Sequence, residues 1–179
     1  MELPRVRARL PRSFADTRNL QQVARVIVFI VLSALGAMAR VGSPFGVLTL
    51  ADAPAYFAAL SFSWVEGALV GGLGTLLAAL VAGFPLGPLV HVYGAVQAAL
   101  WATCLRLAYE RGGPLLALIT TTFLAGVAAA ALCWPLGGLP LVTGSLARLI
   151  ATAAVNVVAA TALFLLLTRS KVVYVRRRY

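Results

Sequence analysis

Two long stretches without a charged residue constrain this chain more than any other feature of its sequence. Residues 67–105 and 112–147 contain no Asp, Glu, Lys or Arg. A transmembrane helix needs about 20 consecutive apolar residues, so each stretch is long enough to cross a bilayer. Only 11% of the 179 residues are charged, whereas a soluble domain has about 25%. The sequence therefore predicts an integral membrane protein with several spans.

Hydropathy predicts an all-α bundle of six transmembrane helices, because in lipid the backbone polar groups must be satisfied within each segment. A basic N-terminal arm (1–22) and a basic tail (169–179) flank the transmembrane domain (23–168). The second span is short and weak, and a five-span alternative treats it as a re-entrant or interfacial piece. The expected spans cover residues 23–39, 48–62, 64–84, 86–107, 114–136 and 145–168.

The positions of the basic residues favour six spans over five. With six, both termini and the loop that carries Arg106 and Arg111 lie on one side, which then holds 13 of the 15 basic residues. Only Arg40 and Arg148 remain at the opposite face. The positive-inside rule makes the basic side cytoplasmic, and with it both termini. The net charge of +10 is thus explained by membrane topology, and the basic residues can also bind anionic lipid. No nucleic-acid partner is expected.

The third expected span carries small residues at helical spacing, namely Gly67, Gly71, Gly74 and Ala78. In lipid, such strips let helices approach one another closely. We therefore expect this span to be a central packing helix, and the glycines to have no chemistry of their own.

Polar side chains gather toward the outer ends of several spans. Arg148, Thr152 and Asn156 follow one another at four-residue spacing on the sixth span, and residues 93, 97 and 101 do the same on the fourth. Polar residues within spans usually face the bundle interior or a water-filled cavity. We expect a pocket open to the outside, although bonds between helices and an aromatic belt are an alternative. The candidate substrate-binding residues are Arg40, Asp52, His91, Tyr93, Gln97, Arg148, Thr152 and Asn156.

The same residues argue against several kinds of chemistry. A single histidine cannot complete a zinc or bis-histidine haem site, so no metal or cofactor is expected. The sequence has no phosphate-binding loop of the G-x-x-x-x-G-K-[ST] type, and its five acidic residues are scattered. Cys104 and Cys133 lie in apolar segments, where we expect them to pack in the core. The chain is expected to bind a ligand and not to be an enzyme.

The order of the segments resembles the substrate-binding S components of energy-coupling factor (ECF) transporters, the vitamin-uptake branch of the ABC transporters. A first span with "VLSALGAMAR" is followed by "LTLADAPAYFAAL" and then by "WVEGALVGGLGTLLAALVAGFPLGPLVH". In that family a glycine-rich third span recurs, ending in an aromatic-proline turn with a histidine soon after. The resemblance covers roughly residues 23–168.

The resemblance implies a six-helix protein of the cell membrane that captures a micronutrient from outside. It also implies two kinds of partner, a transmembrane coupling subunit and two cytoplasmic ATPases. A small-residue strip on the first span docks on the coupling subunit in this family, and here the nearest match is Ser33, Gly36 and Ala37. Members that take up nickel or cobalt begin with Met-His, whereas this chain begins with Met-Glu, which favours an organic substrate.

Arg40, Arg148 and His91 near the expected pocket mouth favour a carboxylate or phosphate on the ligand, because arginine presents a bidentate fork to such groups. His91 has a second interpretation, in which it caps the turn after Pro88. Two other functions stay open for the chain: a ligand-free structural or assembly subunit of a membrane complex, and a stand-alone facilitator.

Overall fold

The computed structural model describes residues 12–170, with side chains from residue 19 onward. In chain order its elements are α1 (Arg12–Met38), the strands β1 (Arg40–Ser43) and β2 (Gly46–Thr49), α2 (Ala53–Ser61), α3 (Trp64–Val81), α4 (Pro88–Phe123), a π-helical turn η1 (Leu124–Ala128), α5 (Ala129–Leu132) and α6 (Trp134–Arg169). Four helical segments are long and apolar enough to cross a membrane: α1 from Asn19, α3, the run from α4 through α5, and α6. The expectation of a helical, multi-pass membrane protein is confirmed to that extent. Parts of the expected N-terminal arm (1–11) and tail (171–179) lie outside the described residues.

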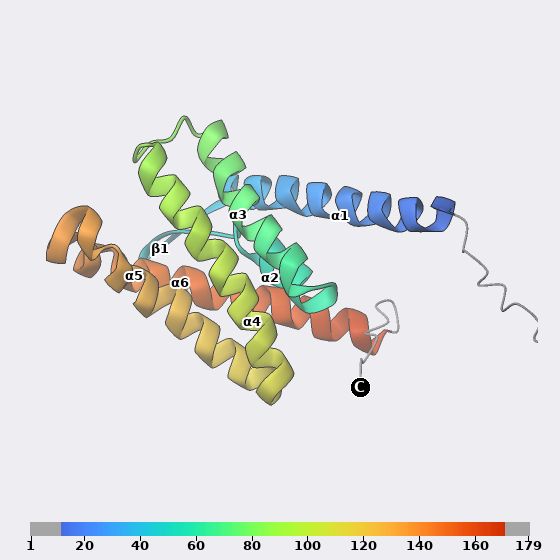
Figure 1. Ribbon diagram of the computed structural model, residues 1–179. Coiled ribbons are helices and arrows are strands. Elements are labelled where there is room, and N and C mark those ends of the chain that lie inside the picture. The colour runs from blue at the N-terminus through green and yellow to red at the C-terminus, as the bar shows by residue number, and fades with distance from the viewer. Residues whose placement is uncertain (1–11, 171–179) are drawn as a thin grey trace, which may run out of the picture.

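The long run from α4 through α5 reverses its direction partway. Gly112 and Gly113 have non-helical backbone angles, and the φ of +71° at Gly113 lies in the left-handed region that glycine adopts without strain. Pro114 then suits the first turn of a new helix, where it leaves no hydrogen bond unmade. Figure 1 shows the chain turning back at this point, in yellow at the bottom of the molecule. The reversal lies between the fourth and fifth spans expected from the sequence. α6 has a similar break at Gly138.

The region of the second expected span, 48–62, differs from the prediction. Its first residues belong to an antiparallel hairpin, in which Arg40 pairs with Thr49 and Ser43 with Gly46. Pro44 and Gly46, with φ of +111° at the glycine, supply the turn chemistry that a hairpin needs. The helix that follows, α2, has nine residues and is about 13 Å long, too short to cross a hydrocarbon core of about 30 Å by itself. The fold is therefore not purely α-helical.

α2 lies at the centre of the molecule. Six consecutive residues, from Ala55 to Leu60, are buried, so the helix is covered on all sides, as expected for an element inside a bundle. Tyr56 and Leu60 are among the largest fully buried side chains, and they join Leu105 of α4 and Phe164 of α6 in the main core cluster. Figure 1 shows α2 enclosed by the longer helices.

The small residues of α3 lie where this helix contacts three neighbours. Gly67 meets Ala59 of α2, and a Cβ added there would collide with it. A Cβ on Gly71 would lie 2.8 Å from the carbonyl oxygen of Ala98 in α4, and one on Gly74 would lie 2.6 Å from Cβ of Ser33 in α1. α3 is thus in backbone-close contact with its neighbours along one strip of its surface.

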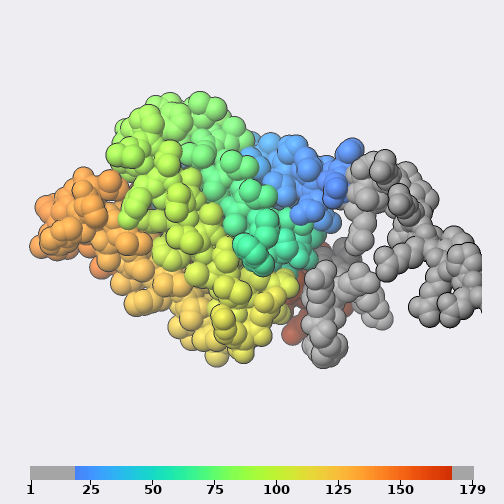
Figure 2. Space-filling model, viewed as in Figure 1, coloured from blue at the N-terminus to red at the C-terminus, as the bar shows by residue number. Residues whose placement is uncertain are grey.

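The outer surface of the bundle is strongly apolar. α1 lies on the outside of the bundle (Figure 2) and exposes large hydrophobic side chains along most of its length. In its most apolar 18 residues, only 11% are buried. Ile27 and Leu35 are each 55% exposed. A continuous apolar surface of this kind is costly in water and matches the acyl chains of a bilayer.

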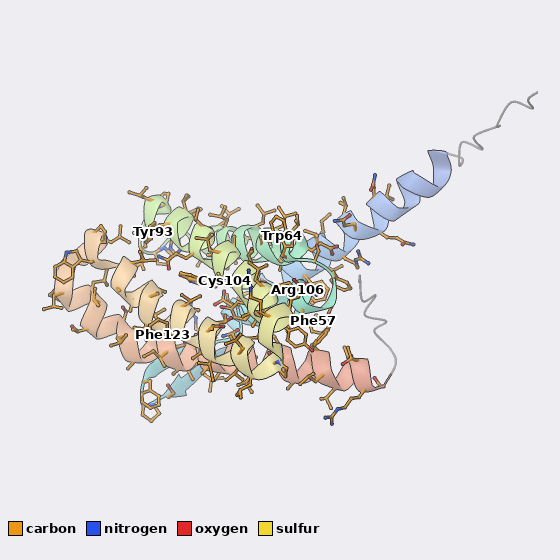
Figure 3. All side chains as sticks on the ribbon, turned by 60° about the horizontal axis from the view of Figure 1, so that its bottom comes forward. Phe57, Trp64, Tyr93, Cys104, Arg106 and Phe123 are labelled. Atoms are coloured by element: carbon orange, nitrogen blue, oxygen red, sulfur yellow. The ribbon has the colours of Figure 1, made fainter. Side chains whose placement is uncertain are left out.

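Arg106 ties the end of α2 to α4. Its Nη1 donates to the carbonyl oxygens of Leu60 at 2.6 Å and of Ala59 at 3.3 Å, while Nε donates to Glu110 at 2.6 Å. Figure 3 shows Arg106 near Phe57 and far from Tyr93, which lies in the first turns of α4. The last carbonyls of a helix lack partners within the helix, and a cation satisfies both their hydrogen-bonding capacity and the helix dipole.

We expect Arg106→Ala to lower the free energy of unfolding by about 2 kcal/mol, because two carbonyls of α2 lose a charged donor. Thermal unfolding in a neutral detergent measures the change. Glu110→Gln is the matched control: it removes the ion pair on the exposed side but keeps the capping contact, so its effect should stay below about 0.5 kcal/mol. Equal losses in the two variants would contradict the capping role.

Candidate functional site

A pocket with a volume of about 210 Å³ lies among α3, α4, η1, α5 and α6, with the residue before α2 at its edge. Its wall is largely apolar and is built from alanines 98, 125, 129 and 153 together with Leu149 and Gly94. The polar and aromatic residues that line it come from four separate parts of the chain. They are Asp52, Thr75, Gln97, Trp101 and Thr152.

The π-helical turn η1 lies beside this pocket and contributes Ala125 to its wall. A single π-helical turn within an α-helical run is uncommon and is frequently found at functional sites. Gly126, on the same turn, allows α6 to approach closely, since a Cβ there would lie 2.8 Å from Cα of Ile150. The wall formed by α6 is therefore held close to η1.

The polar groups of the pocket are rich in hydrogen-bond acceptors. Asp52 makes no side-chain capping bond to α2 and takes part in neither of the ion pairs found among the described residues. The hydroxyl of Thr75 donates to the carbonyl of Gly71 at 2.8 Å, so only its oxygen lone pairs are free to bind a ligand. Gln97 and Thr152 can both donate and accept.

Asn156 fixes the position of the Asp52 backbone. Its side-chain oxygen accepts hydrogen bonds from the backbone N–H groups of Asp52 (3.1 Å) and Ala53 (2.8 Å). Its amide nitrogen donates to the carbonyls of Thr49 (2.7 Å) and Thr152 (2.8 Å). The side chain is fully buried, and both its donors and its acceptor are used within the protein. Asn156 is thus a positioning residue that joins the hairpin, the start of α2 and α6.

The remaining predicted site residues lie outside the wall of the pocket. Arg148 is exposed, and its aliphatic chain runs along Gly46 of the hairpin. His91 packs edge-on against Phe84, with ring centroids 5.7 Å apart, and its Nε2 is buried without a partner among the described residues. The Tyr93 hydroxyl donates to the carbonyl of Leu132 at 2.9 Å.

A second, smaller pocket of about 150 Å³ lies between the C-terminal ends of α1 and α3. Arg40 lines it with Ala37 and Ala78. Of the eight residues predicted for substrate binding, the larger pocket therefore brings together Asp52, Gln97 and Thr152. No group of three or more His, Cys, Asp or Glu side chains that could hold a metal ion occurs within residues 12–170.

Two of the three residues predicted to dock on a coupling subunit are in contact with other segments of this protein. Ser33 is buried against Gly74 of α3. Gly36 accepts a hydrogen bond from the backbone N–H of Leu50 at 3.1 Å, and it lies too close to that residue to carry a side chain. Ala37 is partly exposed. The docking role of this strip stays a prediction.

Thr75 and Trp101 line the pocket, and sequence reasoning counted neither as a candidate. Thr75 has the clearer signal. It is the one side chain with a hydrogen-bonding group between Gly67 and Val90, so its isolation in an apolar segment was an available signal. Trp101 belonged to the four-residue stripe on the fourth span but was not counted among the candidates. Both side chains reach the pocket from helices whose glycines and alanines keep neighbouring backbones close.

The sequence matches no protein-family model and no curated protein. Among solved structures, it is similar to one described as "Structure and mechanism of the S component of a bacterial ECF transporter". The alignment covers 86% of this chain and 96% of the other, with a TM-score of 0.63 and 18% sequence identity. The chain has the fold of an ECF S component. At this identity the likeness establishes the fold alone, and it confirms at that level the resemblance seen in the sequence.

Proposed function

We propose that this protein is the substrate-capture subunit of an ECF-type uptake transporter. It binds a small water-soluble organic micronutrient, a vitamin or a precursor of one, at the outer side of the cell membrane. A transmembrane coupling subunit and two cytoplasmic ATPases then drive delivery inward. In this proposal both termini lie in the cytoplasm. The hairpin and α2 together return the chain toward the inner side, because α2 is too short to cross alone, and the two halves on either side of Gly113 supply two further spans.

The observation that carries the proposal is the pocket among α3, α4 and α6, where Asp52, Gln97 and Thr152 meet within an apolar wall. Unpaired polar side chains inside a membrane bundle are costly, and they typically mark a ligand or ion pathway. A ligand-free assembly subunit does not require polar side chains from three separate segments to line one pocket. The similarity of the fold to that of an S component also supports the proposal.

A thermal-shift screen of the purified protein in neutral detergent tests the proposal. The panel consists of vitamins, their precursors and the first-row divalent metals, and the sample is first extracted to identify any small molecule that copurifies. A ligand at 100 times its dissociation constant stabilises the protein by about 2.7 kcal/mol, which is readily measured. If nothing binds and nothing is extracted, the assembly-subunit alternative is favoured.

Gly94→Leu provides a sharper test of where the ligand binds. Gly94 lines the pocket, and a Cβ added there meets no atom within 4 Å. The new side chain should fill the pocket and reduce affinity at least about 100-fold, with little loss of stability because leucine favours a helix over glycine by roughly 0.8 kcal/mol. Isothermal titration with the ligand found in the screen measures the loss. Unchanged affinity would place binding elsewhere in the molecule.

A further inference from the structure

We propose that the pocket binds a cation: a single planar ring that carries a protonated amine or amidinium group, which pairs with Asp52. This inference rests on the proposed capture function and names the chemical class of the ligand. It differs from the expectation drawn from the sequence, which favoured a carboxylate or phosphate.

Charge is the first argument. Asp52 is the one ionisable side chain that lines the pocket, and no Lys, Arg or His accompanies it. The two arginines and the histidine that favoured an anionic ligand in the sequence lie elsewhere. Arg148 lies along the hairpin, His91 against Phe84, and Arg40 at the second pocket. A carboxylate or phosphate here would face Asp52 without a counter-charge, which is strongly unfavourable in a partly desolvated site.

Hydrogen bonding points the same way. Asp52 can only accept, and Thr75 has its hydrogen committed to Gly71, so it too can only accept. A ligand that satisfies both must offer at least two N–H or O–H donors. Protonated amines and amidinium groups present such donors together with the positive charge, and they make the shorter and stronger kind of bond to a carboxylate.

The shape and surface of the pocket suit one planar ring. An apolar cavity of roughly 150 Å³ is enough to hold benzene, so 210 Å³ accommodates a ring with one substituent. Trp101 supplies an aromatic surface, which attracts both flat rings and cations. A bare divalent metal ion fits less well, since Mg²⁺ or Ca²⁺ needs six or more oxygen ligands and this wall offers a single carboxylate.

Asn156 strengthens the assignment because it holds the acid in place. It binds the backbone N–H groups of Asp52 and Ala53, so the carboxylate is attached to a fixed backbone and its own oxygens remain free. A preorganised acceptor loses little freedom when a cation binds. This arrangement is expected of a residue that contacts the ligand.

Three probes of nearly the same shape test the charge of the ligand: benzamidinium (cation), benzamide (neutral) and benzoate (anion). Each is titrated at millimolar concentration against the full chain in an uncharged detergent, with melting temperature and tryptophan fluorescence as readouts. We expect benzamidinium to bind most tightly, benzamide more weakly, and benzoate not at all. Because the order is measured on the unmodified protein, this test needs no variant to fold.

Asp52→Asn then identifies the residue responsible. The substitution keeps the shape of the side chain, and it should weaken benzamidinium binding about ten- to a hundredfold while leaving benzamide binding unchanged. Retained benzamide binding shows that the variant is folded. Arg148→Ala is the matched control and should alter none of the three affinities.

The outcomes separate this inference from the proposed function. Preferential binding of benzoate, a cation preference that survives Asp52→Asn, or a failure of benzamidinium to bind would each overturn the cationic assignment. If the vitamin and precursor screen still yields a ligand, substrate capture stands without it. If the screen also yields nothing, both are wrong.

Discussion

Asn156→Leu should lower the free energy of unfolding by at least about 3 kcal/mol and abolish ligand binding. Asn156 is fully buried, and its amide satisfies the backbone N–H groups of Asp52 and Ala53 and the carbonyl of Thr49. Leucine has a similar volume but no polar atom, so these groups would lose their partner at about 1–3 kcal/mol each. For a chain of this size the melting temperature should fall by roughly 6–12 °C.

Val158→Leu is the matched control for that experiment. Val158 lies on the same helix, two positions further along, and is 48% exposed on the apolar surface of the bundle. Its replacement should change stability by less than about 0.5 kcal/mol. If Asn156→Leu melts within 2 °C of the unmodified protein, on the scale of about 3 °C per kcal/mol, then Asn156 does not hold the hairpin and α2 together.

A measurement of ligand affinity distinguishes a positioning role of Asn156 from a role in stability alone. In Asn156→Leu, Asp52 loses the bond that fixes its backbone, so affinity for the ligand should fall even at temperatures where the variant is fully folded. Titration well below the melting transition measures this. If folded Asn156→Leu binds the ligand with unchanged affinity, Asp52 is positioned by other contacts.

The positions of the long helices could be predicted from the sequence because a bilayer restricts the backbone conformations that a chain can adopt. The uncharged stretches around Gly71 and Val127 had to form helices, since no other structure satisfies their backbone in a bilayer. The break at Gly112 and Gly113 fell between two expected spans for a local reason, because two glycines before a proline stop a helix whatever surrounds them.

The hairpin and the short α2 did not follow from hydropathy, although Pro44 and Gly46 are local turn signals and Pro54 is a helix-start signal. Residues 48–62 are apolar enough to suggest a span. Asn156, about a hundred residues away in the chain, binds the backbone where α2 begins, and Pro54 stands in the first turn of this helix. The Asn156 amide holds the backbone at Asp52 and Ala53, so that α2 begins there while the preceding residues pair as strands. A bond between residues that distant leaves no trace in the periodicity of either segment.

In the candidate site, too, the sequence predicted some side-chain positions correctly and missed others. Spacing placed Gln97 and Thr152 on inward-facing stripes, and both line the pocket. The same spacing put Arg148 on the stripe of Thr152, yet the side chain of Arg148 is long enough to follow the hairpin at Gly46. Helical periodicity fixes where a Cα lies but not where a flexible side chain ends. Because Arg148 does not reach the pocket, the expected ligand changes from an anion to a cation.

Gly71→Leu should destabilise the bundle by about 3 kcal/mol or more. A Cβ on Gly71 would lie 2.8 Å from the carbonyl oxygen of Ala98 and 3.0 Å from its carbon. Both are backbone atoms of α4, so neither can move aside without shifting the helix. Overpacking of this kind typically costs 1–3 kcal/mol, and a leucine adds three more carbons at the same contact. Thermal unfolding and size-exclusion chromatography measure the loss of stability and any change of oligomeric state.

The neighbouring glycine supplies the control. A Cβ on Gly72 would meet Ala95 and Ala99 at 3.6–3.7 Å, which is ordinary van der Waals contact. Gly72→Ala should therefore be neutral or stabilise the helix by up to about 1 kcal/mol, whereas Gly71→Ala should be less favourable than Gly72→Ala. If the two alanine variants behave alike and Gly71→Leu melts at the original temperature, close approach of α3 and α4 is not what requires glycine at this position.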